Sequence, residues 1–196
     1  VAMPVIEGQV MVSSSSQALG GLVRGVRESD LKALKLVSGN IRAGTLDGFD
    51  EQTGIAIGVR LANQLHVGLG DSITLVSPRG AATPFGTAPR SKPYQITSIF
   101  ELGMSEYDRM MIFMPLKEAQ KYFSKGGEVD VVEVIVNDPE NVDKFRTDIL
   151  QAGGPSIAVA DWRQRNETFF NVLSVERNVM FIILSLIVLV AALNII

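Results

Sequence analysis

Cysteine is absent from this sequence, and histidine occurs only once, as His66. Without cysteine the chain can form no disulfide, no zinc–thiolate site and no cysteine nucleophile. With a single histidine it also cannot build a metal site from several imidazoles. The lack of cysteine is compatible with an oxidising compartment such as the periplasm, but it does not require one.

An excess of basic charge is also missing. The chain has 18 basic and 21 acidic residues, which gives a net charge of −3. Proteins that bind nucleic acid generally are strongly basic, so no nucleic-acid partner is expected. The hydrophobic fraction of 46% over 196 residues is typical of a globular protein with one domain or two small ones.

Catalytic motifs are missing too: the sequence has no G-x-x-x-x-G-K-[ST] phosphate loop, no G-x-G-x-x-G after a strand, no H-E-x-x-H and no G-x-S-x-G. Any ATP hydrolysis therefore belongs to another subunit, and we expect no enzymatic activity and no cofactor. We interpret His66 as structural. Glu106 and Asp108 suggest a metal site or a carboxylate pair, but two acids without further ligands favour a solvated or loop-bracing role.

A long apolar run, in contrast, is present at residues 179–196, "VMFIILSLIVLVAALNII". As a helix this run covers about 27 Å, close to the roughly 30 Å of a bilayer's hydrocarbon core. It stops at the last residue without flanking charges, and the chain begins "VAMPVIEGQV" without an initiator methionine. We therefore predict the start of a truncated transmembrane helix, with a buried core helix as the alternative, in a fragment of a membrane protein.

Hydrophobic periodicity before this run predicts a mixed α+β fold. Apolar residues predict strands at 8–14, 17–26, 55–57, 73–75, 94–100 and 109–116. Helical spacing predicts helices at 28–37 with Ser29 or Asp30 as N-cap, at 59–65, and from Pro115 onward. A strand at 129–138, a helix at 139–153 and a strand at 156–162 then predict a βαβ unit.

From Asp161 onward the pattern becomes helical and leads directly into the apolar run, which predicts a stalk at 161–178. Acidic and basic residues balance one another in this segment. A cytoplasmic flank normally carries a basic excess, so residues 1–178 are expected outside the cytoplasm.

The segment "SPRGAATPFGTAPRSKP", residues 77–93, predicts a loop that is unusually long for a connection between two strands. No acidic residue occurs between Ser72 and Phe100, whereas Arg79, Arg90 and Lys92 are basic. Prolines restrict the backbone, and Phe85 stands at the centre between Pro84 and Gly86. An aromatic anchor with nearby arginines is typical of protein-binding surfaces. A mobile linker, or a loop folded back on its own domain, is the alternative interpretation.

Several segments together resemble a known family. "TGIAIGVRLANQLHVGLGDSITLVSP", "YDRMMIFMPLKEAQ" and "DWRQRNETFFNVLSVERNVMFIILSLIVLVAALNII" are similar to the LolC/LolE permease subunits of the lipoprotein-releasing ABC transporter, within the MacB- and FtsX-like permease class. The resemblance implies a periplasmic MacB-like core domain followed by a stalk helix that runs into a transmembrane helix. A ferredoxin-like βαβ porter part, incomplete at its N-terminus, is implied at 1–38 and 128–160, and a mainly β sabre part at 39–127.

The resemblance also implies a role for the long loop as a hook, at residues 78–89, that captures a periplasmic carrier. LolE-type subunits lack an extended hook, so the loop favours the LolC type or the single hybrid permease of some bacteria. The implied hook residues are Pro78, Arg79, Thr83, Pro84, Phe85, Gly86 and Pro89. Arg90 and Lys92 are the implied basic patch beside the hook, although Thr74 replaces a further arginine of some members. Phe169, Phe170, Leu173 and Val175 are the implied stalk residues along the lipid path.

The function implied is lipoprotein release from the inner membrane of a Gram-negative bacterium, with hand-over to a LolA-type carrier. The implied partners are that carrier, a second permease of the LolE type or an identical copy, a cytoplasmic LolD-type ATPase, the lipoprotein substrates and the membrane. The alternative is a MacB-like efflux or FtsX-like signalling permease with another periplasmic partner. A membrane-tethered enzyme is the less favoured third possibility, because the sequence shows no catalytic constellation.

Overall fold

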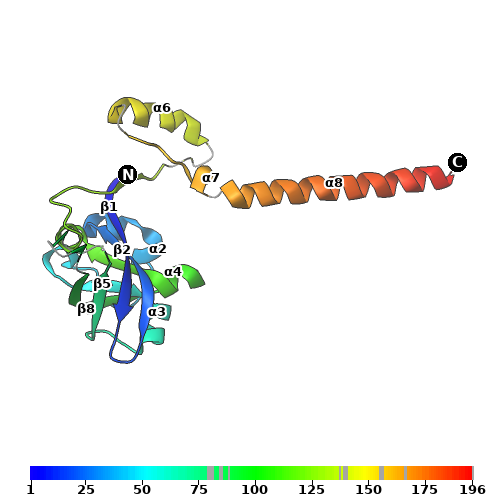
Figure 1. The fold of residues 1–196 in the computed structure, drawn as a ribbon. Coiled ribbons are helices and arrows are strands. Elements are labelled where there is room, and N and C mark those ends of the chain that lie inside the picture. The colour runs from blue at the N-terminus through cyan, green and yellow to red at the C-terminus, as the bar shows by residue number, and fades with distance from the viewer. Residues whose placement is uncertain are drawn as a thin grey trace. The chain divides into compact units, whose positions relative to one another are not determined.

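A computed structural model describes residues 1–78, 82–83, 86–87, 89–136, 138, 141–154, 157–165 and 167–195. The chain divides into two compact units, Val1–Ile135 and Val136–Ile196, which we describe separately (Figure 1).

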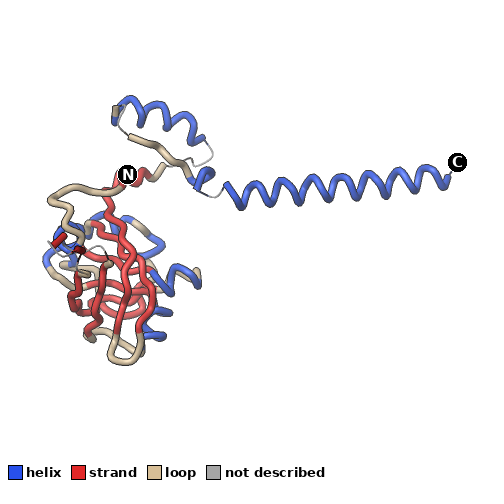
Figure 2. Tube along the Cα trace, viewed as in Figure 1, coloured by secondary structure: helices blue, strands red, loops and turns tan. Residues whose placement is uncertain are grey.

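The first unit is a mixed α+β structure in which strands predominate (Figure 2). Its strands are β1 (Ala2–Ser13), β2 (Ala18–Val26), β3 (Ile41–Gly44), β4 (Ile55–Gly58), β5 (Ser72–Ser77), β6 (Ala82–Thr83), β7 (Gly86–Thr87), β8 (Arg90–Phe100), β9 (Met111–Pro115) and β10 (Val131–Val134). Its helices are α1 (Glu28–Ala33), α2 (Lys35–Ser38), α3 (Val59–Leu65), α4 (Ser105–Met110) and α5 (Leu116–Tyr122), with a 3₁₀ turn, η1, at Phe49–Glu51.

The strand pairings of this unit close on themselves. β1 pairs with β2, β2 with β9, β9 with β4, β4 with β8, β8 with β5, and β5 again with β1. This ring is a barrel in which each member strand pairs with a neighbour on either side. β10 and β3 lie outside the ring and pair with the barrel strands β1 and β8. β1 is long enough to pair with β10 through residues 2–5 and with β5 through residues 11–13.

Alternation along the strands separates two apolar clusters, one on each face of the sheet. On β9, Ile112 and Met114 belong to one cluster, whereas Met111 and Phe113 belong to the other. Successive side chains of a strand point to opposite faces, so a strand that is buried on both faces has a continuous apolar sequence. All of β9 is buried, which explains why "MIFMP" shows no polar alternation.

The predicted helix at 28–37 is wrong as a single helix. It is two short helices separated at Leu34, whose ψ of 87° is outside the helical region, and Arg27 is the N-cap rather than Ser29 or Asp30. Leu31 and Val37, one on each short helix, both lie in the same apolar cluster. The other predicted strands and helices of this unit are confirmed in position, with boundary shifts, and residues 105–110 form α4 ahead of β9.

The second unit contains α6 (Val142–Gly153), α7 (Trp162–Arg165) and α8 (Glu167–Ile195). The predicted strand at 156–162, and with it the βαβ unit, is wrong for the described part of that segment, because residues 157–161 pair with no other strand. An extended segment becomes a strand only when a neighbour satisfies its backbone groups. Here Arg146 of α6 instead donates to the Val159 carbonyl at 3.3 Å, and its guanidinium lies 3.8 Å from the Asp161 carboxylate.

Within α8, Asn171–Leu193 is long and apolar enough to cross a membrane, with a mean hydropathy of 2.1. This segment starts before the predicted residue 179 and includes Leu173 and Val175. The stalk at 161–178 stays a prediction. The porter part at 1–38 and 128–160 and the sabre part at 39–127 also stay predictions. The strands of residues 1–135 belong to one continuous sheet, apart from the β6–β7 pair.

Candidate functional site

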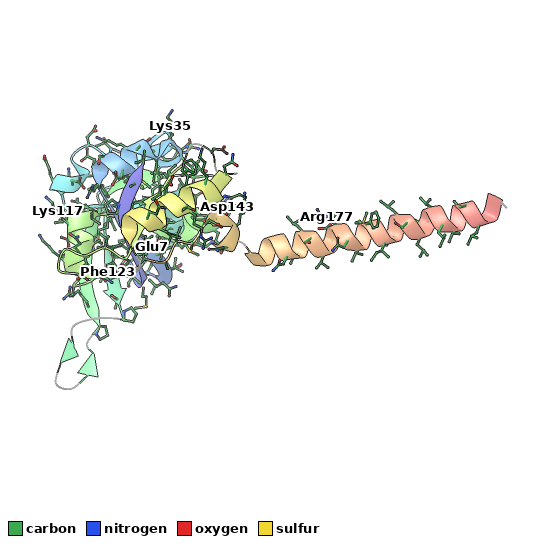
Figure 3. All side chains as sticks on the ribbon, turned by 90° about the horizontal axis from the view of Figure 1, so that it is seen from above. Glu7, Lys35, Lys117, Phe123, Asp143 and Arg177 are labelled. Carbon is green, nitrogen blue, oxygen red and sulfur yellow. The ribbon has the colours of Figure 1, made fainter. Side chains whose placement is uncertain are left out.

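The long loop leaves the barrel from one pair of neighbouring strands. β5 and β8 are antiparallel, and their ladder runs from Ser72 opposite Gln95 to Ser77 opposite Arg90. Between them, β6 and β7 form a separate two-stranded sheet in which Ala82 pairs with Thr87 and Thr83 with Gly86 (Figure 3). The loop is therefore a hairpin that extends the β5–β8 pair.

The structure tests the predicted hook residues only in part. Pro78 and Pro89 are exposed, and Thr83 and Gly86 are paired as stated above. Arg79, Pro84 and Phe85 lie outside the described residues, so the hook as a binding element stays a prediction.

Arg90, the first residue of β8, is held against the end of α5. Its Nη1 donates to the main-chain carbonyls of Lys121 at 2.5 Å and Tyr122 at 2.7 Å. The Tyr122 hydroxyl in turn donates to the Arg90 carbonyl at 3.3 Å. The last carbonyls of a helix have no partner within the helix and carry a partial negative charge, so a guanidinium is a suitable cap for them.

Lys92 is held by a buried carboxylate on the same helix. Its Nζ lies 2.6 Å from Oε1 of Glu118, and the Tyr94 hydroxyl donates to the same oxygen at 2.9 Å. The Glu118 side chain is only 7% exposed, whereas that of Lys92 is 45% exposed. The Lys92 ammonium also lies 5.1 Å from the centre of the Tyr94 ring, within cation–π distance.

The two tyrosines of this site have raised pKa values, because their ionised forms are unfavourable in the protein interior. Burial, and then the neighbouring Glu118 carboxylate, raise the pKa of Tyr94 above its usual range. Burial raises the pKa of Tyr122 to about 12. Both phenols therefore stay protonated at neutral pH and are available as hydrogen-bond donors.

These groups surround an open pocket of about 310 Å³ at the base of the loop. Its lining residues are Arg90, Ser91, Lys92, Glu118, Lys121 and Tyr122. Three of them are basic, and Glu118 compensates Lys92, so the remaining positive charge of the lining belongs to Arg90 and Lys121. The described residues contain no cluster of three or more His, Asp or Glu side chains that would hold a metal.

Of the acidic pair Glu106 and Asp108, Asp108 stabilises the loop in which it lies. Asp108 is 1% exposed, and its carboxylate accepts hydrogen bonds from the backbone N–H groups of Leu102 at 2.7 Å and Gly103 at 3.1 Å. Glu106 is exposed. The prediction of a loop brace is confirmed for Asp108.

Sequence reasoning identified Arg90 and Lys92 but missed their partners. The sequence analysis did not single out Glu118, which lies four residues before the buried Tyr122 on α5 and shares its helix face. That spacing was the available signal, because side chains at i and i+4 lie on the same side of a helix.

The predicted stalk residues lie on α8. Leu173 and Val175 are exposed, at 43% and 62%. For Phe169 and Phe170 the structure describes the helical backbone alone. None of these observations assigns the four residues a role, which stays a prediction.

Proteins of known name match this chain along its full length. It is 27% identical to "Lipoprotein-releasing system transmembrane protein LolC" of Neisseria meningitidis serogroup B over 197 residues, which covers 100% of this chain and 48% of that protein. A LolC of Xylella fastidiosa is also 27% identical, over 100% of this chain and 47% of that protein. A LolE of Haemophilus influenzae is 23% identical over 98% of this chain and 46% of that protein. The chain thus spans about half the length of these relatives.

A solved structure supports the fold. The extracellular domain of the noncanonic ABC-type transporter YknZ from Gram-positive bacteria aligns with a TM-score of 0.52 at 12% identity, covering 78% of this chain and 75% of that one. The predicted resemblance to LolC/LolE-type permeases is confirmed by the relatives above. Residues 1–152 match the family of the MacB-like periplasmic core domain. This match covers most of the sequence, and the chain belongs to that family.

Proposed function

We propose that this chain is the periplasmic part of a LolC-type permease subunit, and that the complete transporter releases lipoproteins from the inner membrane. The observation that carries the proposal is the similarity to LolC proteins over 100% of the chain, which includes both the barrel and the apolar helix. The similarity to LolE covers nearly the same length at lower identity. The presence of a long loop between β5 and β8 favours the LolC type.

In this proposal the loop at 78–89 is the hook on which a LolA-type carrier docks. Phe85 is its apolar anchor, with Pro78, Arg79, Thr83, Pro84, Gly86 and Pro89 as the other hook residues. Aromatic anchors carry a large share of binding energy at protein interfaces. The positive charge of Arg90 and Lys121 at the pocket beside the loop base supports the proposal, because surface charges raise the rate of association with an acidic partner.

The ends of the first unit suit a domain inserted between membrane segments. The Ile135 N–H donates to the Val1 carbonyl at 2.8 Å, so the chain enters and leaves this unit at neighbouring positions. α8 then provides a membrane-spanning helix by length and composition. We place the first unit, and the chain up to the membrane-crossing part of α8, in the periplasm of a Gram-negative bacterium, within a multi-pass inner-membrane protein. The predicted boundary at residue 178 lies inside the apolar segment Asn171–Leu193. Phe169, Phe170, Leu173 and Val175 are then positioned along the lipid path.

The partners of the complete transporter are part of the same proposal. They are a second permease of the LolE type or an identical copy, a LolD-type cytoplasmic ATPase and the lipoprotein substrates. The chain itself acts as a non-enzymatic transport subunit, and ATP is hydrolysed by the cytoplasmic partner.

The test is binding of the purified LolA-type carrier of the same organism to the full chain in lipid nanodiscs. Phe85→Glu is expected to abolish binding without changing the circular dichroism spectrum, because a carboxylate cannot enter an apolar pocket of the partner. Leu36→Glu is the matched control, since Leu36 is a 52% exposed leucine on α2, outside the loop. Binding by Phe85→Glu as strong as wild type would remove the hook from the proposal. Absence of binding by the wild type would favour a MacB-like efflux or FtsX-like role.

A further inference from the structure

The structure assigns Glu118 as the positioning residue of the docking loop, an inference that rests on the proposed function. Glu118 is a buried carboxylate on α5 that holds Lys92 and Tyr94 of β8 through one oxygen, Oε1. Together with the contact of Arg90 on the end of α5, it fixes the first residues of β8 against a helix of the barrel. The direction in which the hairpin leaves the barrel is set by these contacts.

The contacts form a continuous clamp along the start of β8. Arg90 donates hydrogen bonds to the carbonyls of Lys121 and Tyr122, and the Tyr122 hydroxyl donates one to the Arg90 carbonyl. Two residues further along, Lys92 reaches Glu118 at the other end of the same short helix. The rings of Tyr94 on β8 and Tyr122 on α5 also pack edge to face, with centroids 5.8 Å apart. β8 is thus held by polar contacts of Arg90, Lys92 and Tyr94 with α5 and by one aromatic contact.

This arrangement divides the predicted basic patch into two residues with different roles. The charge of Lys92 is compensated by Glu118 at 2.6 Å, so it contributes little to a long-range field. Arg90 contacts main-chain carbonyls, and among the described residues no carboxylate lies within ion-pair distance of its guanidinium. Arg90 therefore retains its charge for an approaching partner, whereas Lys92 acts mainly through Glu118.

Glu118→Gln separates positioning from electrostatic attraction, because the two roles predict opposite results. If Lys92 and Arg90 acted only by attracting an acidic carrier, removal of the nearby negative charge would speed association. If Glu118 positions the loop, the substitution weakens the Lys92 contact and loosens β8. We then expect affinity to fall by about 3- to 30-fold, mostly through faster dissociation, which is typical of residues that act on a binding site without touching the ligand.

The experiment measures association and dissociation rates of the LolA-type carrier on the full chain in nanodiscs, at low and high salt. Glu118→Gln is compared with Glu101→Gln, which removes the acid of the exposed Arg42–Glu101 ion pair beyond the far end of β8. Arg90→Lys is the second variant, since it keeps the charge but loses the guanidinium geometry at the two carbonyls. Weaker binding by Glu118→Gln and Arg90→Lys, with Glu101→Gln unchanged, supports the assignment. Faster association of Glu118→Gln without loss of affinity overturns it.

A measurement without the carrier keeps the inference independent of the proposed function. Hydrogen exchange of the backbone amides at the loop ends of β5 and β8 is expected to accelerate in Glu118→Gln, while exchange in β9 stays as in wild type. Unchanged exchange at β5 and β8 overturns the clamp whether or not the carrier binds. Failure of the wild type to bind the carrier, with accelerated exchange in the variant, overturns the proposed function and leaves the clamp intact.

Discussion

Substitution of Lys92 by methionine tests whether a residue of the basic patch also supports the fold. The ammonium of Lys92 is the ionic partner of Glu118, whose side chain is 7% exposed. Methionine keeps the length and apolar stem of lysine but removes the charge. Glu118 is then left as a buried carboxylate with the Tyr94 hydroxyl as its remaining described partner.

The expected cost follows from the burial of the two groups. Removal of one partner of a fully buried ion pair costs about 3–5 kcal/mol, because the remaining charge is uncompensated. Here the Lys92 side chain is 45% exposed, so water screens part of the attraction. We therefore expect a loss of roughly 1–3 kcal/mol in the free energy of unfolding, which lowers Tm by about 3–9 °C for a unit of this size.

Denaturant and thermal unfolding of the full chain, followed by circular dichroism, measure this loss. Lys117→Met is the matched control, because Lys117 precedes Glu118 on α5 and lies exposed at the surface of the first unit (Figure 3). The double variant Lys92→Met/Glu118→Gln is expected to recover most of the loss, since a neutral amide oxygen still accepts the Tyr94 hydrogen bond. If Lys92→Met is as stable as Lys117→Met, the pair contributes nothing to the fold and the argument fails.

Two further predictions concern packing and pH. Gly58→Ala is expected to destabilise the fold by roughly 1–3 kcal/mol, because its Cβ would lie 2.3 Å from the Asp108 carbonyl oxygen, whereas Gly20→Ala, with no atom within 4 Å, is the neutral control in denaturant unfolding. Equal stability of the two variants would show that the backbone at Asp108 moves freely. The free energy of unfolding is expected to fall between pH 10 and about pH 12, since the pKa of Tyr122 is raised from 10.0 to about 12 and only the unfolded chain ionises in that window. Tyr122→Phe is expected to reduce this fall by about 2–3 kcal/mol, and an identical pH profile for both proteins would contradict it.

The barrel strands could be predicted from the sequence because their signal is local. Alternating Ile73 and Leu75, or the continuous apolar residues of β9, report burial one strand at a time. Closure of the barrel could not be predicted in this way. It depends on the parallel pairing of β2 with β9 and on the contact of residues 11–13 with residues 74–76, which are remote in the sequence.

In the βαβ unit predicted at 129–162, the sequence indicated a strand that the structure does not form. "SIAVADW" has the composition of a strand, yet composition states only that a segment fits a pleated and partly buried surface. Whether residues 157–161 form a strand depends on a neighbour that offers unpaired backbone groups, and no periodicity within the segment contains that information. The contacts of Arg146 with the Val159 carbonyl and the Asp161 carboxylate could not be predicted from the sequence either.

The candidate site was predictable where it depends on charge and unpredictable where it depends on burial. The absence of acids from 72 to 100 made Arg90 and Lys92 stand out. Glu118 compensates Lys92 from α5, outside that range, so the local charge count overstated the free positive charge. The number of basic residues in a sequence segment is therefore an upper limit on its free positive charge, because the fold can place an acid from elsewhere in the chain beside them.

Within the first unit, the barrel connects the base of the long loop to the point where the chain leaves that unit. β1 pairs with β5 through residues 11–13, next to the loop-bearing hairpin, and with β10 through residues 2–5, next to the exit from the unit. A closed barrel with a packed interior does not deform gradually, so a displacement applied at β10 moves the hairpin base with it as one body. The clamp between β8 and α5 extends that rigidity to the first residues beyond the loop. Without Glu118, the start of β8 is expected to move more independently of the barrel, and the proposed hook would move with it.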